Sequence, residues 1–303
     1  MTLTKGRLFT DTSDFFAIDC GDEILAGDQR YLVTGHERER RFGIEDPKFW
    51  VKKAVHCETG EKKLIKLSYL ESFDVTVGGV KIRCFRNPDK EGEILELVKG
   101  HPHFMQGKSF TDPNGNNIRV LDIVLGPNLF VYIESVRTDH RTYFETELPQ
   151  ILRRLITAFE AMKFLHEKGF RHGDIRNDHL IIERNTGRYV WIDFDYDFVP
   201  GESPFSLDIF GLGNILIYTV GKGFHTLYSI DGDREFYGDL IDRLEPGDFS
   251  LLDKWRFVNL QKIFPYIPTA LNDIIMHFSR EANIYYEYTE EIIDDLNRYL
   301  DTV

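Results

Sequence analysis

Apolar and polar residues follow two different patterns along this chain of 303 residues. In the first part, short runs rich in Val, Ile, Phe and Tyr are bounded by Gly, Pro, Asn and Asp, which is typical of β-strands. A hairpin is predicted between Val75 and Phe85, because the paired glycines at 78 and 79 accept the positive φ angles of a tight turn. The other predicted strands are Tyr31–Thr34, Phe49–Cys57, Lys62–Leu67, Ile118–Val124 and Leu129–Glu134.

Apolar residues at helical spacing occur in two places, once between the predicted strands and once after the last of them. Asp89 is a residue type that caps helices, and it predicts a helix that runs to Lys99. Over residues 149–169, apolar residues recur at helical spacing, which predicts a long amphipathic helix. We therefore expect an α+β protein that changes from β-rich to helix-rich near residue 136. The chain is long enough to bury one large core or two smaller ones.

Composition and charge limit the classes of partner. The hydrophobic content of 42% indicates a globular protein, and the net charge of -13 disfavours binding to nucleic acid or acidic membrane surfaces. No apolar run approaches the roughly 18 residues of a spanning helix, and the first residues lack a secretion signal, so we expect a cytoplasmic protein. Cys20, Cys57 and Cys84 are not spaced as metal-binding pairs, and neither a zinc site nor a disulfide framework is expected.

Two aspartates nineteen residues apart carry the most specific chemical signal. Asp174 lies in the run RHGDIRNDHLII and Asp193 in the run YVWIDFDYDF, on either side of a predicted short hairpin. One carboxylate can orient a hydroxyl group and accept its proton, while the other holds the Mg²⁺ that bridges the phosphates of ATP. The pair therefore favours phosphoryl transfer.

From about residue 30 to residue 303 the chain resembles a protein kinase, because several motifs follow one another in that family's order. The resemblance implies a bilobal fold, with an antiparallel sheet and one helix in the first lobe and a mainly helical second lobe. It implies that Val51 contacts the nucleotide and that Lys66 pairs with the ATP phosphates. Glu91, in the run EGEILELVKGHPHF, stands where the family's helix glutamate bonds that lysine.

Alternatives to this pair remain open at the level of sequence. Glu93 is a second candidate for the helix glutamate, and Lys62 and Lys63 are weaker candidates for the lysine. Alternation along a strand sends Lys63 to the opposite face from Lys66.

The resemblance also implies an adenine-binding connection and a catalytic loop. The predicted strand over residues 129–133 resembles the one that precedes the connection, so backbone groups of Glu134 and Val136 are expected to contact adenine. Asp174 resembles the catalytic aspartate, and Arg176 takes the place of the lysine that steadies the transferring phosphate. Asp193 takes the place of the metal-binding aspartate of the family's DFG triplet.

Three further residues resemble supports of this loop. Asp208 opens a segment that resembles the buried helix beneath the catalytic loop, where its carboxylate would bond backbone amides. His166 and His172 are expected to be structural, because a kinase reaction needs no imidazole.

Departures from the family pattern affect nucleotide binding. The three positions that are glycine in the phosphate-covering loop hold Ile44, Asp46 and Phe49, whose side chains hinder close approach of backbone N–H groups to phosphate. Leu64 replaces a small residue beneath adenine. His179 replaces an asparagine metal ligand and favours Mn²⁺ over Mg²⁺, while Asp195 replaces a glycine and can supply a further metal ligand.

Other departures affect regulation. Gly173 replaces the arginine that pairs with a phosphorylated activation loop, so control by such phosphorylation is not expected. Only thirteen residue steps separate Asp195 from Asp208, which is too short for a full activation segment. The expected substrate platform is therefore reduced.

Two hypotheses follow. In the first, the protein is an ATP-dependent phosphotransferase of protein kinase type, which uses Mg²⁺ or Mn²⁺ and phosphorylates a protein Ser or Thr in preference to a small-molecule hydroxyl. In the second it is a pseudokinase, a nucleotide-binding or empty scaffold for a partner protein. The predicted divisions are an N-terminal extension of open role at 1–28, a first lobe at 29–136 and a second lobe at 137–303.

Overall fold

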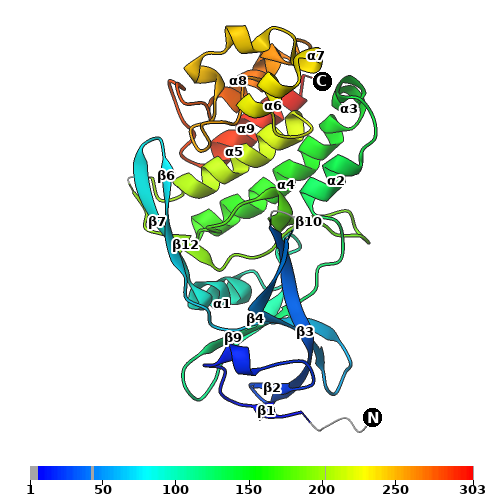
Figure 1. The fold of residues 1–303 in the computed structure, drawn as a ribbon, viewed down its shortest axis with the longest axis vertical. Coiled ribbons are helices and arrows are strands. Elements are labelled where there is room, and N and C mark those ends of the chain that lie inside the picture. Colours follow the sequence, from blue (N-terminus) through cyan, green and yellow to red (C-terminus); the bar gives the residue numbers. More distant parts are fainter. Residues whose placement is uncertain (1–5, 42–43, 202, 303) are drawn as a thin grey trace. The chain divides into compact units, whose positions relative to one another are not determined.

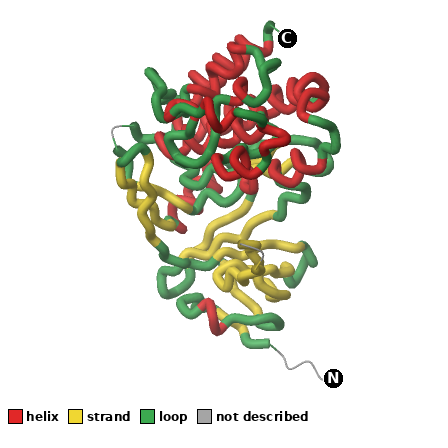
Figure 2. The backbone as a smooth tube through the Cα atoms, turned by 45° about the horizontal axis from the view of Figure 1, so that its top comes forward, coloured by secondary structure: helices red, strands yellow, loops and turns green. Residues whose placement is uncertain are grey.

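The computed structural model describes residues 6–41, 44–201 and 203–302, which form two units (Figure 1). The first unit extends to Glu71 and resumes over Arg86–Val124. The second unit comprises Ser72–Phe85 and the chain from Leu125 onwards. Strands dominate the first unit and helices the second (Figure 2), which confirms the predicted α+β fold.

Within the described residues, seven strands form the sheet of the first unit, in the order β1-β2-β3-β4-β5-β9-β8. The β1 and β2 strands are parallel, and every later neighbouring pair is antiparallel. Helix α1 contacts β8 and β9. The elements are β1 (Leu8–Phe9), η1 (Phe15–Ala17), β2 (Glu23–Ala26), β3 (Gln29–Arg41), β4 (Ile44–His56), β5 (Lys62–Lys66), α1 (Pro88–Leu97), β8 (Gly107–Thr111) and β9 (Asn117–Asp122).

Most of the elements predicted for this unit are present. The strand predicted at 31–34 falls within β3, and the one predicted at 49–57 matches β4 as far as His56. Both strands begin or end well outside the predicted ranges because they pair with each other along a ribbon. The helix predicted from Asp89 is α1, but its cap is Asn87, whose side chain accepts a hydrogen bond from the Lys90 amide at 3.0 Å. The β8 strand was not predicted.

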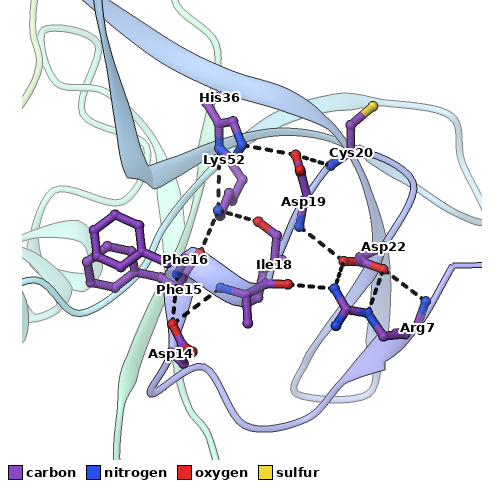
Figure 3. Close-up of polar contacts among 11 residues, drawn as sticks. Arg7, Asp14, Phe15, Phe16, Ile18, Asp19, Cys20, Asp22, His36 and Lys52 are labelled. Atoms are coloured by element: carbon purple, nitrogen blue, oxygen red, sulfur yellow. Dashed lines mark hydrogen bonds and ion pairs between the residues drawn. The ribbon is translucent and has the colours of Figure 1, made fainter.

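Residues 6–28 belong to the first unit, and Figure 3 shows polar contacts of this segment, among them those of Arg7 and Asp19. Its residues Ile18 and Ile24 are fully buried in the core of that unit. The buried ammonium group of Lys52, on β4, donates hydrogen bonds to the carbonyl oxygens of Phe15 at 2.8 Å and Ile18 at 2.6 Å. Burial lowers the pKa of Lys52 to about 8. The extension is therefore fastened to the sheet by main-chain contacts and by its own apolar residues.

The second unit is built around helix α4, which matches the helix predicted over residues 149–169. It contacts α3, α5, α9 and β11, and no helix among the described residues is long and apolar enough to cross a membrane. The main helices are α2 (Leu129–Ser135), α3 (His140–Thr146), α4 (Leu148–Glu167), α5 (Ser206–Val220), α6 (Leu227–Gly232), α7 (Arg234–Tyr237), α8 (Thr269–Met276) and α9 (Thr289–Leu300). The strands are β6 (Ser72–Val77), β7 (Val80–Arg86), β10 (Leu180–Ile182), β11 (Tyr189–Trp191) and β12 (Tyr196–Phe198), and a short turn of helix, η2 (Asn177–His179), precedes β10.

The strand predicted over Leu129–Glu134 is wrong, because these residues form helix α2. The Asn128 side chain caps the helix by accepting a hydrogen bond from the Val131 amide at 2.9 Å. Leu129 and Ile133, four positions apart, are both fully buried. Burial of this one helical face outweighs the strand preference of the run LFVYI.

The hairpin predicted between Val75 and Phe85 is confirmed as β6 and β7. Gly78 and Gly79 both have positive φ angles, 56° and 87°, as the tight turn requires. The β7 strand lies between β6 and β12 in a second sheet.

Candidate active site

A buried aspartate supports the loop that carries Asp174. Asp208, at the start of α5, accepts hydrogen bonds from the backbone amides of His172 at 2.7 Å and Gly173 at 2.8 Å. Its carboxylate also lies 3.0 Å from Nε2 of His166. Burial alone would raise the pKa of Asp208, but the hydrogen bond and charge of His166 and the loop amides lower it. The carboxylate therefore holds the loop as an ionised acceptor, in the role that the resemblance implied.

The two histidines near this loop have structural contacts. His166 bridges Asp208 and the hydroxyl of Thr289, 3.0 Å from its Nδ1 atom, and stacks on Phe205. His172 is fully buried, and its ring lies edge-on to Trp191 at 5.5 Å. Both arrangements fit the structural roles expected from the sequence.

Strand pairing brings the two motif aspartates close to one histidine. In the β10–β11 hairpin, Leu180 pairs with Trp191, so the residue before β10 and the residues after β11 are neighbours. The amide of Ile192 accordingly donates a hydrogen bond to the carbonyl oxygen of His179 at 3.0 Å. Asp193 follows directly, with a φ angle of 66° that is costly for a residue with a Cβ atom.

His179 lies between the carboxylates of Asp174 and Asp193. Its Nδ1 atom is 2.9 Å from the carbonyl oxygen of Asp174 and 3.5 Å from Oδ2 of the same residue. Because both neighbours are acceptors, we assign the proton of a neutral ring to Nδ1. The lone pair of Nε2 then lies 3.4 Å from Oδ2 of Asp193. Two electron-pair donors so close together are stabilised by a cation or a proton between them.

Asp174 is partly shielded from water, with a side chain that is 23% exposed. Burial raises its pKa, and the charges of His179 and Arg176 oppose that rise. A carboxylate whose pKa is raised is a stronger proton acceptor than an ordinary surface aspartate.

Arg176 is oriented by a residue that the sequence did not single out. Its Nε and terminal nitrogen atoms lie 2.9 and 2.7 Å from the two carboxylate oxygens of Asp178. This bidentate pair fixes the plane of the guanidinium group, which belongs to a residue two positions after Asp174. The sequence signal that could have revealed the pair was the spacing of two residues between Arg176 and Asp178.

Asp195 is almost completely buried, with 1% of its surface exposed, directly before β12. Its predicted role as a metal ligand remains a prediction. In the part of the chain that the structure describes, no group of three or more His, Cys, Asp or Glu residues is arranged to hold a metal ion.

The first unit contains the predicted pair of Lys66 and Glu91. Nζ of Lys66 lies 2.9 Å from Oε1 of Glu91, and their side chains are 8% and 0% exposed. The alternatives are placed elsewhere, since Glu93 is exposed and Lys63 pairs with Asp122 at 2.7 Å. Val51 is buried on β4 and pairs across the sheet with Lys66.

Sequence reasoning missed a second cation at this pair. Nε of Arg119, on β9, lies 3.0 Å from Oε2 of Glu91, and the arginine side chain is 1% exposed. It also donates a hydrogen bond to the carbonyl oxygen of Leu67 at 3.1 Å. The β5–β9 register pairs Arg119 with Lys66, which places both cations at one carboxylate. An arginine between apolar strand residues was the only sequence signal.

The cluster of Lys66, Glu91 and Arg119 has a net charge of +1 when all three groups are ionised. Two buried cations share its one carboxylate, and such cations suit contact with the phosphates of a nucleotide.

The remaining nucleotide-binding predictions meet a different local structure. Glu134 lies within α2 and Val136 is its C-terminal cap, so neither follows a strand. The interpretation of these residues as adenine contacts has therefore lost its structural basis. The strand that pairs with β5 is β9, which ends at Asp122.

The glycine-poor region is a strand ribbon. Ile44 and Asp46 pair with Arg41 and Glu39 of β3, and residues 42–43 lie outside the described residues. The ring of Phe49 packs on Phe16 of the N-terminal segment, with 5.4 Å between the ring centres.

Comparison with known proteins gives kinases. No family model matches the chain. The serine/threonine-protein kinase RAD53 of Saccharomyces cerevisiae is 26% identical over 200 residues, which are 65% of this chain and 22% of that protein. The phosphorylase b kinase gamma catalytic chain, liver/testis isoform, of Bos taurus is 26% identical over 154 residues, 50% of this chain and 36% of that protein. The hormonally up-regulated neu tumor-associated kinase homolog of Xenopus tropicalis is 26% identical over 144 residues, 48% of this chain and 19% of that protein. The matched region is thus well under half the length of each of these relatives.

Proposed function

Because this chain belongs to the protein kinase-like superfamily, we propose that it is an ATP-dependent phosphotransferase that transfers the γ-phosphate to a hydroxyl group, of a protein Ser or Thr in preference to a small molecule. One observation carries the proposal. The carboxylates of Asp174, on the loop that the buried Asp208 supports, and of Asp193, shortly after β11, each lie within 3.5 Å of the imidazole ring of His179. The raised pKa of Asp174 and the positive φ angle of Asp193 are both unfavourable for stability, and phosphoryl transfer gives a functional reason for them.

The residues have the following roles in this reaction. Asp174 orients the acceptor hydroxyl and takes its proton, which its raised pKa favours. Arg176, held in plane by Asp178, stabilises charge on the transferring group. Lys66, held by Glu91, pairs with donor phosphates, and Arg119 adds a second positive charge to that region.

Asp193 and His179 would hold the divalent metal ion. Their donor atoms, a carboxylate oxygen and an imidazole nitrogen 3.4 Å apart, suit Mn²⁺ better than Mg²⁺. Asp195 is the candidate for a further ligand. When bound, the metal ion would neutralise charge on the donor phosphates. In place of Glu134 and Val136, we assign the adenine contacts to the backbone of residues 123–125, which follow β9.

Transfer of label from γ-labelled ATP tests the proposal. The wild type is compared with Asp174→Asn, Asp193→Asn and the matched control Asp294→Asn, an exposed acid on α9. We expect label on protein hydroxyl groups with the wild type and the control, and a loss of at least about 100-fold with each site variant. Equal label in all four proteins would refute the enzyme.

The pseudokinase hypothesis rests on the sequence, in which Ile44, Asp46 and Phe49 stand where the family's phosphate-covering loop has glycine. Thermal melting separates the two hypotheses. A nucleotide at about 100 times its dissociation constant adds roughly 2.7 kcal/mol to the free energy of unfolding. A stabilisation by ATP with Mn²⁺ or Mg²⁺ together with label transfer supports the enzyme. The absence of any shift with both metals supports a scaffold that engages a partner protein.

A further inference from the structure

The six residues that follow Asp193 form a buried strand segment, which we call the post-Asp193 segment (residues 194–199). Phe194, Asp195 and Phe198 are each no more than 1% exposed, and Tyr196 and Asp197 are less than 9% exposed. Only Val199, at the end, is largely exposed. Movement of this segment out of its place would expose these side chains to water, which costs free energy.

An element from another part of the sequence covers this segment. The β7 strand pairs with β12, and β6 pairs with β7, so the hairpin of residues 72–85 extends the segment into a sheet. The amide of Val199 donates a hydrogen bond to the carbonyl oxygen of Arg83 at 2.9 Å. The ring of Phe73 lies edge-on to Tyr196, with 5.6 Å between the ring centres. The hairpin precedes α1 in the sequence, yet it belongs to the second unit.

The catalytic loop contacts the same segment from its own side. Nε of Arg171 lies 2.8 Å from Oδ1 of Asp197, and the arginine also lies over the ring of Phe198 at 5.0 Å. Gly173 has a φ angle of 87°, and a Cβ atom there would lie 1.9 Å from the carbonyl oxygen of Tyr196. The missing side chain at Gly173 is what allows the two backbones to approach.

These contacts link the two catalytic carboxylates. Arg171 is three residues before Asp174, and Asp197 is four residues after Asp193. The ion pair therefore spans the loop that carries one carboxylate and the segment that carries the other. The acidic partner in this ion pair is an aspartate, which carries its negative charge without phosphorylation.

We propose that Arg171 and Asp197, with the hairpin of residues 72–85, are positioning elements that hold Asp193 in its metal-binding place at all times, so that the enzyme is active without phosphorylation of this segment. The inference rests on the proposed function, because it concerns the placement of a residue in that reaction. The hairpin supplies the strand pairing that keeps residues 194–199 in place.

The test compares Arg171→Ala, the conservative Arg171→Lys, Asp197→Asn and the charge-exchanged double variant Arg171→Asp with Asp197→Arg. The control is Lys262→Ala, which removes a partner of an ion pair of similar burial at 2.7 Å from Asp248, remote in sequence from the site. Two readouts are used: kcat and KM for phosphoryl transfer, and hydrogen exchange of the amides of residues 193–199.

We expect Arg171→Ala and Asp197→Asn to lower kcat by about 10- to 100-fold with little change in KM for ATP, because displacement of a catalytic group by an ångström has an effect of that size. Exchange at residues 193–199 rises in parallel. Arg171→Lys and the double variant recover part of both, whereas Lys262→Ala changes neither. Wild-type protein treated with a phosphatase keeps its full activity.

Three results would overturn the proposal. The first is wild-type exchange and kcat in Arg171→Ala. The second is a fall in kcat without faster exchange, which would mean that Arg171 acts on the substrate rather than on the segment. The third is loss of wild-type activity after phosphatase treatment. If the wild type transfers no phosphate at all, the proposed function fails by itself. Unchanged exchange in Arg171→Ala and Asp197→Asn would then separately refute the positioning role of the ion pair.

Discussion

In the buried cluster of Lys66, Glu91 and Arg119, we expect the loss of Glu91 to destabilise the protein more than the loss of Lys66. Removing Glu91 leaves two cations, 8% and 1% exposed, without the carboxylate that both contact. Removing one partner of a buried ion pair costs about 3–5 kcal/mol. Removing Lys66 instead leaves the pair of Arg119 and Glu91 in place. We therefore expect Glu91→Ala to lower the free energy of unfolding by about 3–5 kcal/mol, and Lys66→Met by about 1 kcal/mol or less.

Urea denaturation measures these differences, and hydrogen exchange of the Leu67 amide, bonded to the carbonyl oxygen of Trp50 at 2.8 Å, locates them in the first unit. The double variant Glu91→Ala with Arg119→Met also removes the second cation that contacts Glu91, so it is expected to be more stable than Glu91→Ala alone. Equal destabilisation by Lys66→Met and Glu91→Ala would refute the charge balance. A double variant no more stable than the single one would refute it as well.

Three further predictions concern other sites. Gly173→Ala is expected to destabilise the protein by roughly 2 kcal/mol or more in urea and to abolish transfer, because of its φ of 87° and the contact with Tyr196, whereas Gly232→Ala, with open space around it, is neutral in both assays. The pKa of Lys52 in the folded protein, about 8, is below its ordinary value of 10.5. The folded state then binds fewer protons between these values, so the free energy of unfolding rises with pH across this window, by up to about 3 kcal/mol relative to Lys52→Met; a constant difference between the two proteins from pH 7.5 to 10.5 would contradict this. His179→Asn is expected to lower affinity for Mn²⁺ relative to Mg²⁺ by roughly tenfold, measured by electron paramagnetic resonance of free Mn²⁺ and competition with Mg²⁺, and an unchanged ratio would exclude the imidazole as a ligand.

Local patterns were sufficient for much of the fold. The glycine pair at 78 and 79 predicted a hairpin because two consecutive glycines accept the positive φ angles of a tight two-residue turn, and the long helix α4 followed from the spacing of its apolar residues. The run LFVYI was misassigned because its residue types favour a strand. The burial of Leu129 and Ile133 on one face depends on neighbours that are distant in sequence.

Parts of the candidate site were likewise visible in the sequence, and parts were not. The resemblance to protein kinases pointed to Lys66 with Glu91, and the structure brings these side chains together. Arg119 and Asp178 escaped notice because an isolated arginine or aspartate resembles any solvated charge until its partner is known. The assignment of adenine contacts to Glu134 and Val136 failed with the strand on which it depended.

The amino-acid sequence by itself determined most of the elements and the residue types available for phosphoryl transfer, because propensity, turn chemistry and motif order act over short distances. Tertiary structure alone decided which charges meet. The pairing of Arg171 with Asp197, the two cations at Glu91 and the docking of residues 72–85 beside β12 all join residues through packing and strand register. Such contacts depend on the free energy of the whole fold, which no local pattern encodes.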